Sequence, residues 1–114
     1  MDQTRLRANQ EYRDVLKRGR SVANDLAVLY VLEREGSRRL GVSVPRRFGT
    51  AVARNRVRRL FWEAYRFCGP HLLDRFDLVI IPRRGARGKR YREVLCALEE
   101  LCARSGIWRK AALS

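Results

Sequence analysis

An almost unbroken apolar run, Phe76–Ile81 (FDLVII), constrains the fold more than any other segment of the sequence. A strand with one face in water alternates apolar and polar residues, so a continuous run predicts a strand covered on both faces. Two further strands are expected, because Leu26–Glu33 is rich in β-forming residues and Leu40–Val44 alternates large apolar residues with Gly and Ser. We expect these two runs to pair as a hairpin. Pro45 should end the second run, since proline cannot donate to a β-ladder.

Three helices are expected around these strands. Asn9 can cap a short helix that stops at Gly19, and Thr50 can cap a longer one over residues 51–67. The third helix is predicted from apolar residues at helical spacing and is expected to end at Gly106. These residues are Tyr91, Val94, Leu95, Leu98, Leu101 and Cys102. The predicted order is α-β-β-α-β-α, an α+β sandwich of helices on a small mixed sheet. The helix between the last two strands permits a parallel β-α-β crossover.

The length of 114 residues favours a single domain over residues 1–114. The longest apolar run, Leu26–Leu32, is far shorter than the roughly 20 residues that a membrane-spanning helix needs. The first residues, Met1–Arg5, lack the apolar segment of a secretory signal. We therefore expect no association with membranes.

The charge is the unusual feature of the composition. The chain has 26 Lys and Arg against 12 Asp and Glu, a net charge of +14. Such self-repulsion destabilises a compact fold, so a polyanionic partner, above all nucleic acid, is the simplest explanation. The basic residues are concentrated, with nine Arg and one acid over Arg38–Arg66 and six basic residues and no acid over Arg83–Arg92. These two segments are the expected binding surface.

The predicted helix over residues 51–67 separates into two faces at about 100° per residue. One face is apolar and is expected to pack on the sheet: Ala53, Val57, Leu60, Phe61 and Ala64. The opposite arc carries Arg54, Asn55, Arg58, Arg59 and Arg66, and Arg56 lies on its far flank. Arg54 and Arg58 form a like-charge i, i+4 pair, which is unfavourable unless an anion lies between them. The helix is therefore predicted to bind phosphates, the alternative being a merely solvated face.

Trp62 falls in the middle of this basic arc. An exposed Trp among arginines can stack on an unpaired base. The alternative is that it folds over the edge between helix and sheet, or stacks on a neighbouring Arg.

The sequence offers no set of residues for catalysis. Cys68, Cys96 and Cys102 are odd in number and lack CxxC spacing, so small buried side chains are favoured over a disulfide framework or a metal site. His71 follows Gly-Pro in an expected loop and is a weak candidate for a general base. By itself, the protein is expected to be chemically inert and to hold no metal.

The segment Gly49–Leu60 (GTAVARNRVRRL) resembles the signature of the bacterial ribonuclease P protein subunit, an Arg-Asn-Arg core followed by an apolar residue and two basic ones. The strand before it, the basic pair Arg46-Arg47, the Asp77–Ile81 strand and the last helix also fit. The resemblance covers about residues 5–108, which we take as the core of the domain.

The resemblance implies a subunit that binds a large catalytic RNA, in a holoenzyme that removes the 5′ leader from precursor tRNA in the bacterial cytoplasm. The RNA is expected to carry the endonuclease chemistry with Mg²⁺, and the protein alone to be inactive. The family fold has the order α-β-β-β-α-β-α, with a left-handed crossover around the arginine helix.

Residue by residue, the resemblance assigns contacts with the catalytic RNA to Arg46, Arg47, Arg54, Asn55, Arg56, Arg58 and Arg59. Trp62 stands where another Arg is usual, and Arg66 continues the same arc. Tyr12 and Tyr30 match aromatic positions of a cleft for the single-stranded leader, although each side chain fits a core position equally well. Leu16 stands at a position that is usually aromatic. Gly41 and Ser43 leave the strand face beside them nearly bare, so that a nucleic-acid backbone could approach.

Two other functions fit the same composition. A basic RNA-binding protein without enzymatic partners, such as a ribosomal protein or an RNA chaperone, is the alternative. A helix-turn-helix DNA reader is disfavoured because the segment before the arginine helix is predicted to be a strand, and DNA is not expected as a partner.

Overall fold

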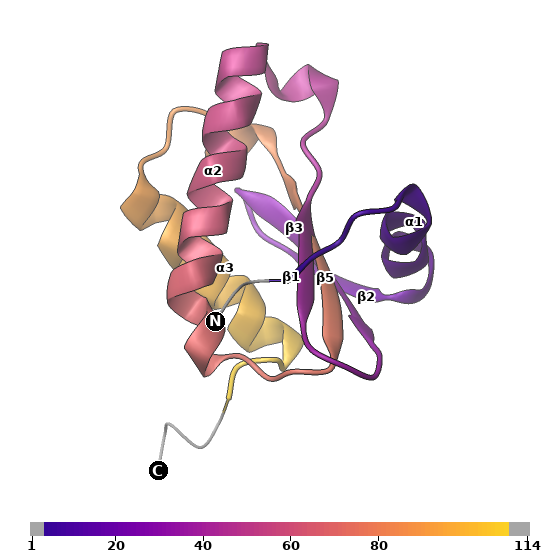
Figure 1. The fold of residues 1–114 in the computed structure, drawn as a ribbon. Coiled ribbons are helices and arrows are strands. Elements are labelled where there is room, and N and C mark those ends of the chain that lie inside the picture. The colour runs from indigo at the N-terminus through magenta and orange to yellow at the C-terminus, as the bar shows by residue number, and fades with distance from the viewer. Residues whose placement is uncertain (1–3, 110–114) are drawn as a thin grey trace.

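The computed structural model describes residues 4–109, which form one mixed sheet with helices on both faces (Figure 1). The strands are β1 (Thr4–Arg5), β2 (Arg20–Ala23), β3 (Ala27–Glu33), β4 (Arg39–Val42) and β5 (Phe76–Pro82). The helices are α1 (Asn9–Arg18), α2 (Ala51–Cys68) and α3 (Tyr91–Ser105). Three short 3₁₀ turns, η1 (Arg46–Phe48), η2 (Gly69–His71) and η3 (Arg84–Ala86), lie in the connections. The predicted α+β sandwich is confirmed.

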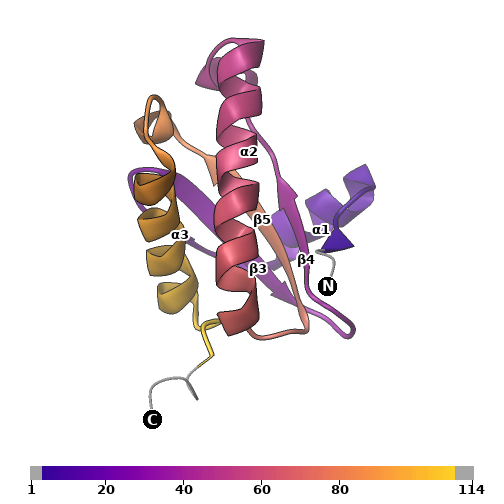
Figure 2. The same cartoon turned by 60° about the vertical axis from the view of Figure 1, so that its left-hand side comes forward.

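Helices α2 and α3 lie side by side on one face of the sheet, and α1 covers part of the other (Figures 1 and 2). Strand β5 is buried on both faces, as its apolar sequence predicts. Leu78 and Ile80 point into the main core under α2 and α3, whereas Val79 joins a smaller core with Val15 of α1 and Leu6. The alternation of the strand thus divides the interior into two cores.

The predicted hairpin between the Leu26–Glu33 and Leu40–Val44 runs is wrong. The strand order is β1-β4-β5-β3-β2, so β5 lies between β3 and β4. Strand β3 pairs antiparallel with β5 and with β2, and β4 pairs parallel with β5. The physical reason is that β5 is the strand buried on both faces, and the centre of the sheet is the place where a helix layer covers each face.

Strand β2 is absent from the prediction made on residue pattern, because it is only four residues long and its two exposed and two half-buried residues do not alternate. Its hairpin with β3 turns at Asn24, whose Oδ1 accepts hydrogen bonds from the backbone N–H groups of Leu26 and Ala27. The three strands between the first two helices match the order that the family resemblance implies, and β1 precedes them. The parallel crossover from β4 through α2 to β5 is confirmed. The left-handedness of this crossover, which the family resemblance implies, stays a prediction.

The helix ends follow local chemistry, with one correction. Thr50 caps α2, since its Oγ1 accepts from the N–H of Ala53 at 3.1 Å. Asn9 is the first helical residue of α1 and not its cap. Glu11 takes the capping role, because its Oε1 accepts from the backbone N–H groups of Arg7 at 2.7 Å and of Ala8 at 3.2 Å.

An ion network fastens the start of α1 to the sheet. The buried carboxylate of Asp77 accepts from Arg39 Nε at 2.8 Å and Nη2 at 2.6 Å, and from Arg34 Nε at 2.6 Å. Arg39 Nη1 also donates to Oε2 of Glu11 at 3.1 Å. Although desolvation raises the pKa of Asp77, the hydrogen bonds from Arg39 and Arg34 bring it below its ordinary value. The network therefore fixes the position of α1 over β4 and β5.

Candidate nucleic-acid interface

Helix α2 rests on the sheet by the predicted apolar stripe. Val57, Leu60, Phe61 and Ala64 are buried, and Ala53 is half-buried at the start of the helix. In its second half the buried surface widens, because Tyr65 and Cys68 also face the main core. The helix is thus a rigid support for the side chains on its remaining faces.

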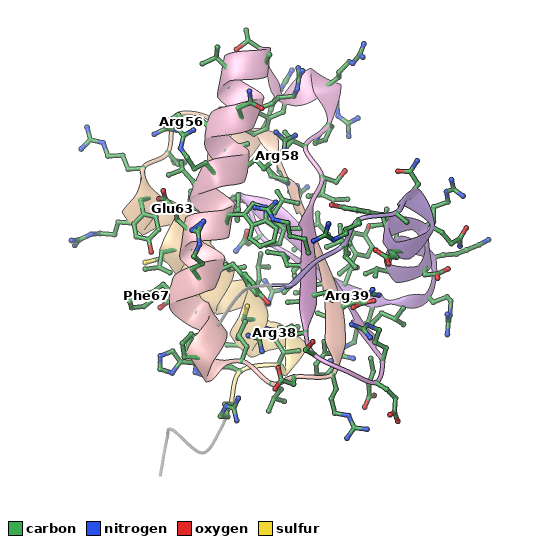
Figure 3. The ribbon with its side chains drawn as sticks, in the orientation of Figure 1. Arg38, Arg39, Arg56, Arg58, Glu63 and Phe67 are labelled. Carbon is green, nitrogen blue, oxygen red and sulfur yellow. The ribbon has the colours of Figure 1, made fainter. Side chains whose placement is uncertain are left out.

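The arginines of α2 have no acidic partner among residues 4–109. Asn55, Arg59 and Arg66 are exposed, and Arg54, Arg56 and Arg58 are half-exposed. No carboxylate lies within 4.0 Å of any of these guanidinium groups in the described part of the chain. Arg56 and Arg58 extend to opposite sides of the helix (Figure 3). Both flanks of α2 therefore present positive charge that the protein itself does not neutralise.

Local hydrogen bonds hold some of these side chains in place. Nη1 of Arg58 donates to Oδ1 of Asn55 at 2.9 Å, and Nη1 of Arg54 donates to the carbonyl oxygen of Gly49 at 2.8 Å. Each guanidinium keeps further N–H groups free, as phosphate binding requires.

Arg38 and Arg39, in contrast, bind acceptors within the protein itself. Arg38 donates to the Tyr65 hydroxyl at 2.7 Å and to the carbonyl oxygens of Gly69 and Leu72, while Arg39 is held by Asp77. These two side chains stabilise the fold. The basic surface, which was predicted to begin at Arg38, therefore begins only at η1. The sequence gives no local signal of this difference, because the acceptors lie far along the chain.

The second predicted basic segment meets the first at the start of α2. Arg46 and Arg47 of η1 are exposed, and a Cβ placed on Gly49 would lie 3.9 Å from the Arg87 guanidinium of the loop after β5. Arg47, Arg83 and Arg84 line one hollow of about 620 Å³. The fold thus brings the two basic segments together.

The exposed position expected for Trp62 is wrong. Its side chain is buried, with only 6% of the residue exposed, and the ring lies edge-on to Tyr65 with centroids 5.8 Å apart. The guanidinium carbon of Arg5 lies 4.1 Å from the ring centroid. The alternative of stacking on an Arg is confirmed, but that Arg comes from β1, which pairing with β4 brings beside α2.

Three of the four leader-cleft candidates come together. Tyr12, Leu16 and Ser43 line one hollow of about 530 Å³ between α1, β4 and α2, and Arg58 lines its α2 side. Leu16 is 37% exposed at this site. Tyr30 is separate, since it packs against the small core around Val15 and Val79. Asn9 and Arg13 line the same hollow, although the sequence did not single them out for it.

Gly41 does not leave its strand face open to a nucleic-acid backbone. A Cβ on Gly41 would lie 2.5 Å from three atoms of the Tyr12 ring, so this ring already fills the space. Burial raises the pKa of the Tyr12 phenol above its ordinary value, and the nearby charges of Arg5 and Arg58 partly offset that rise. The missing side chain of Gly41 therefore leaves the space that the Tyr12 ring occupies.

Replacing Gly41 by alanine is expected to destabilise the fold by about 1–3 kcal/mol, because the added methyl group overpacks the Tyr12 ring. Urea denaturation measures the change. In a Tyr12→Ala background the same substitution should cost much less, since the clashing ring is gone. Equal costs in both backgrounds would contradict the packing of Tyr12 on Gly41.

The described residues hold no metal-binding cluster, and two of the three cysteines are buried. Within residues 4–109, no three His, Cys, Asp or Glu side chains are placed to hold a metal ion. Cys68 and Cys102 are buried as expected, whereas Cys96 is exposed on α3, contrary to expectation, because it lies on the side of the helix away from the core. Over the same part of the chain, none of the helices is long and apolar enough to span a bilayer.

Comparison with known proteins agrees with this description. The family model for ribonuclease P matches residues 1–106. The chain belongs to the ribonuclease P protein family. A ribonuclease P protein component from Clostridium kluyveri is 39% identical over 112 residues, covering 96% of this chain and 100% of the relative. One from Clostridium botulinum (strain 657) is 41% identical over 110 residues, covering 95% and 99%.

Solved structures of ribonuclease P proteins share the fold. The protein from Staphylococcus aureus superposes with a TM-score of 0.85 at 26% identity, covering 95% of this chain and 100% of that one. The protein from Thermotoga maritima gives a TM-score of 0.81 at 29% identity, covering 90% and 97%. The chain is thus a protein component of ribonuclease P, an endoribonuclease of tRNA 5′ processing that contains an RNA subunit. The alternative of a ribosomal protein or RNA chaperone is not favoured.

Proposed function

We propose that this chain binds the catalytic RNA of ribonuclease P through α2 and η1, and the 5′ leader of precursor tRNA through the hollow beside α1. The observation that carries the proposal is the row of α2 arginines without acidic partners among the described residues. A fold this positive is destabilised by its own charge, and RNA phosphates between Arg54 and Arg58 relieve the repulsion.

The hollow supports the second half of the proposal. Tyr12 and Leu16 supply an apolar wall, Ser43 a hydroxyl and Arg58 a guanidinium, which together suit an unpaired nucleotide with its phosphate. Because Arg58 belongs both to α2 and to this hollow, one strand of RNA bound there lies next to the catalytic RNA bound on the helix.

The cleavage chemistry is assigned to the RNA subunit with its Mg²⁺ ions. The described residues of the protein do not fit a resident Mg²⁺ site, since they lack a carboxylate cluster that could hold one. The protein's part is to reduce phosphate repulsion where RNA and substrate meet, in the bacterial cytoplasm where precursor tRNA is made.

Reconstitution tests this function. At low Mg²⁺, adding the protein to ribonuclease P RNA is expected to restore cleavage of leader-bearing precursor tRNA, because guanidinium groups replace screening by metal ions. The protein alone should cleave nothing. With the RNA present, it should also strengthen binding of precursor tRNA over mature tRNA. Equal strengthening of both would contradict a leader contact, and no effect on cleavage would contradict the function as a whole.

A further inference from the structure

The N-terminal strand is fixed in place beside α2. Arg5 pairs with Leu40 in the parallel ladder between β1 and β4, and the N–H of Leu6 donates to the Leu40 carbonyl oxygen at 3.0 Å. The Leu6 side chain is 4% exposed and anchors in the small core with Val15 and Val79. The backbone on the C-terminal side of Arg5 is therefore held by both hydrogen bonds and burial.

The side chain of Arg5 lies over the Trp62 ring while remaining exposed. The guanidinium carbon is 4.1 Å from the ring centroid, within the range of a cation–π contact. The indole covers one side of the guanidinium, and the Arg5 residue is otherwise exposed. Within residues 4–109 no carboxylate lies within 4.0 Å of this group.

The position of this guanidinium is at the junction of the two proposed RNA sites. Trp62 follows Arg58 by one helical turn, and residues at this spacing are neighbours on a helix surface. Arg58 lines the hollow with Tyr12. The charges of Arg5 and Arg58 both lower the pKa of the Tyr12 phenol, which places both guanidinium groups near that ring.

We propose that Arg5, held on the ring of Trp62, binds an RNA phosphate between the arginines of α2 and the hollow at Tyr12. The inference rests on the proposed function of these two sites. Trp62 does not stack on a base; it positions a cation from another element. Because the stack orders the Arg5 side chain before RNA arrives, little conformational entropy is lost on binding. A guanidinium also matches phosphate oxygens in a bidentate manner.

The test compares two substitutions of Arg5 in binding to ribonuclease P RNA at several salt concentrations. Arg5→Met keeps an unbranched stem over the Trp62 ring but removes the charge. It is expected to weaken binding about tenfold and to reduce the slope of log K against log salt by about 0.7–0.9, as for one lost phosphate contact. Its melting temperature should stay within a few degrees of the wild type. Arg5→Ala should bind equally weakly and melt lower.

Controls separate this inference from the proposed function. Arg104→Ala removes one charge from α3, where Glu100 is its neighbour, and should change binding little. Arg59→Ala removes one charge from α2 and should weaken binding. If Arg5→Met binds like the wild type while Arg59→Ala is weakened, Arg5 has only a structural role. If both bind like the wild type, the proposed function of α2 is wrong as well.

Trp62→Leu adds a second readout. Leucine keeps an apolar side chain but removes the aromatic face, so Arg5 loses its support and keeps its charge. Binding is expected to weaken about threefold with the salt slope unchanged. If Trp62 acts only through Arg5, Trp62→Leu should not weaken binding further in an Arg5→Met background. A further threefold loss in that background would overturn the positioning role.

Discussion

Asp77→Asn is expected to lower the free energy of unfolding by about 3 kcal/mol at neutral pH, because breaking a buried ion pair from one side leaves charges without a partner. The Asp77 side chain is 4% exposed and accepts three hydrogen bonds from Arg34 and Arg39. An amide offers one acceptor oxygen and places an NH₂ group against a guanidinium. We expect the loss at the lower end of the range for buried pairs, since both arginines remain partly exposed to water.

The same carboxylate makes stability depend on pH. The folded-state pKa values of Asp77 and Glu11 lie below their ordinary values of 3.8 and 4.5. The stabilisation is therefore present above these ordinary values and is lost as the pH falls through the lower folded-state values. Urea denaturation of the wild type should show a decline in stability below about pH 4 that is shallower in Asp77→Asn. Asp74→Asn is the matched control, because Asp74 is 65% exposed and pairs with Arg38 at the surface. Equal effects of the two substitutions would contradict the network.

A triple substitution of Arg56, Arg58 and Arg59 by alanine is expected to weaken binding to ribonuclease P RNA by about 1,000-fold or more at low salt, because each of the three lost charge-assisted hydrogen bonds contributes about 1.5–3 kcal/mol. Folding should not suffer. Alanine has the highest helix propensity, and the substitutions remove like charges from one helix. Filter binding measures the affinity, and thermal denaturation should give an unchanged or raised melting temperature.

The control for this variant removes the same charge elsewhere. Lys17, Arg104 and Arg109 are exposed on α1, α3 and the C-terminal segment, outside η1 and α2. Their triple alanine variant should bind RNA within a few-fold of the wild type. Equal losses in the two variants would show that net charge alone governs binding and that α2 is not a specific site.

Local chemistry was enough to predict the helices and the central strand. The Thr50 side chain caps the start of α2, and Gly106 ends α3 in a left-handed conformation that glycine adopts easily. The apolar run Phe76–Ile81 by itself indicates a strand covered on both faces. Strand partners do not follow from such signals. The hairpin prediction assumed that strands next to each other in the sequence pair in the sheet, as they often do. It failed because β5 is inserted between β3 and β4.

The candidate site was predicted only in part, because it too depends on contacts between segments far apart in the sequence. The periodicity of α2 identifies which arginines leave the core, but it placed Trp62 outside because the buried surface of the helix widens toward Tyr65. That widening depends on β1, which covers the Trp62 ring with Arg5. Likewise, nothing near Arg38 and Arg39 in the sequence distinguishes them from the arginines of α2, since their acceptors lie more than 25 residues away.

The salt dependence of binding to ribonuclease P RNA tests most directly whether α2 neutralises RNA phosphates. The slope of log K against log salt should be steep for the wild type and shallower by about 2–3 for the Arg56, Arg58 and Arg59 triple variant, with about 0.7–0.9 lost per phosphate contact. Parallel slopes for the two proteins would show that these guanidinium groups do not meet phosphates, and would contradict an RNA interface on α2.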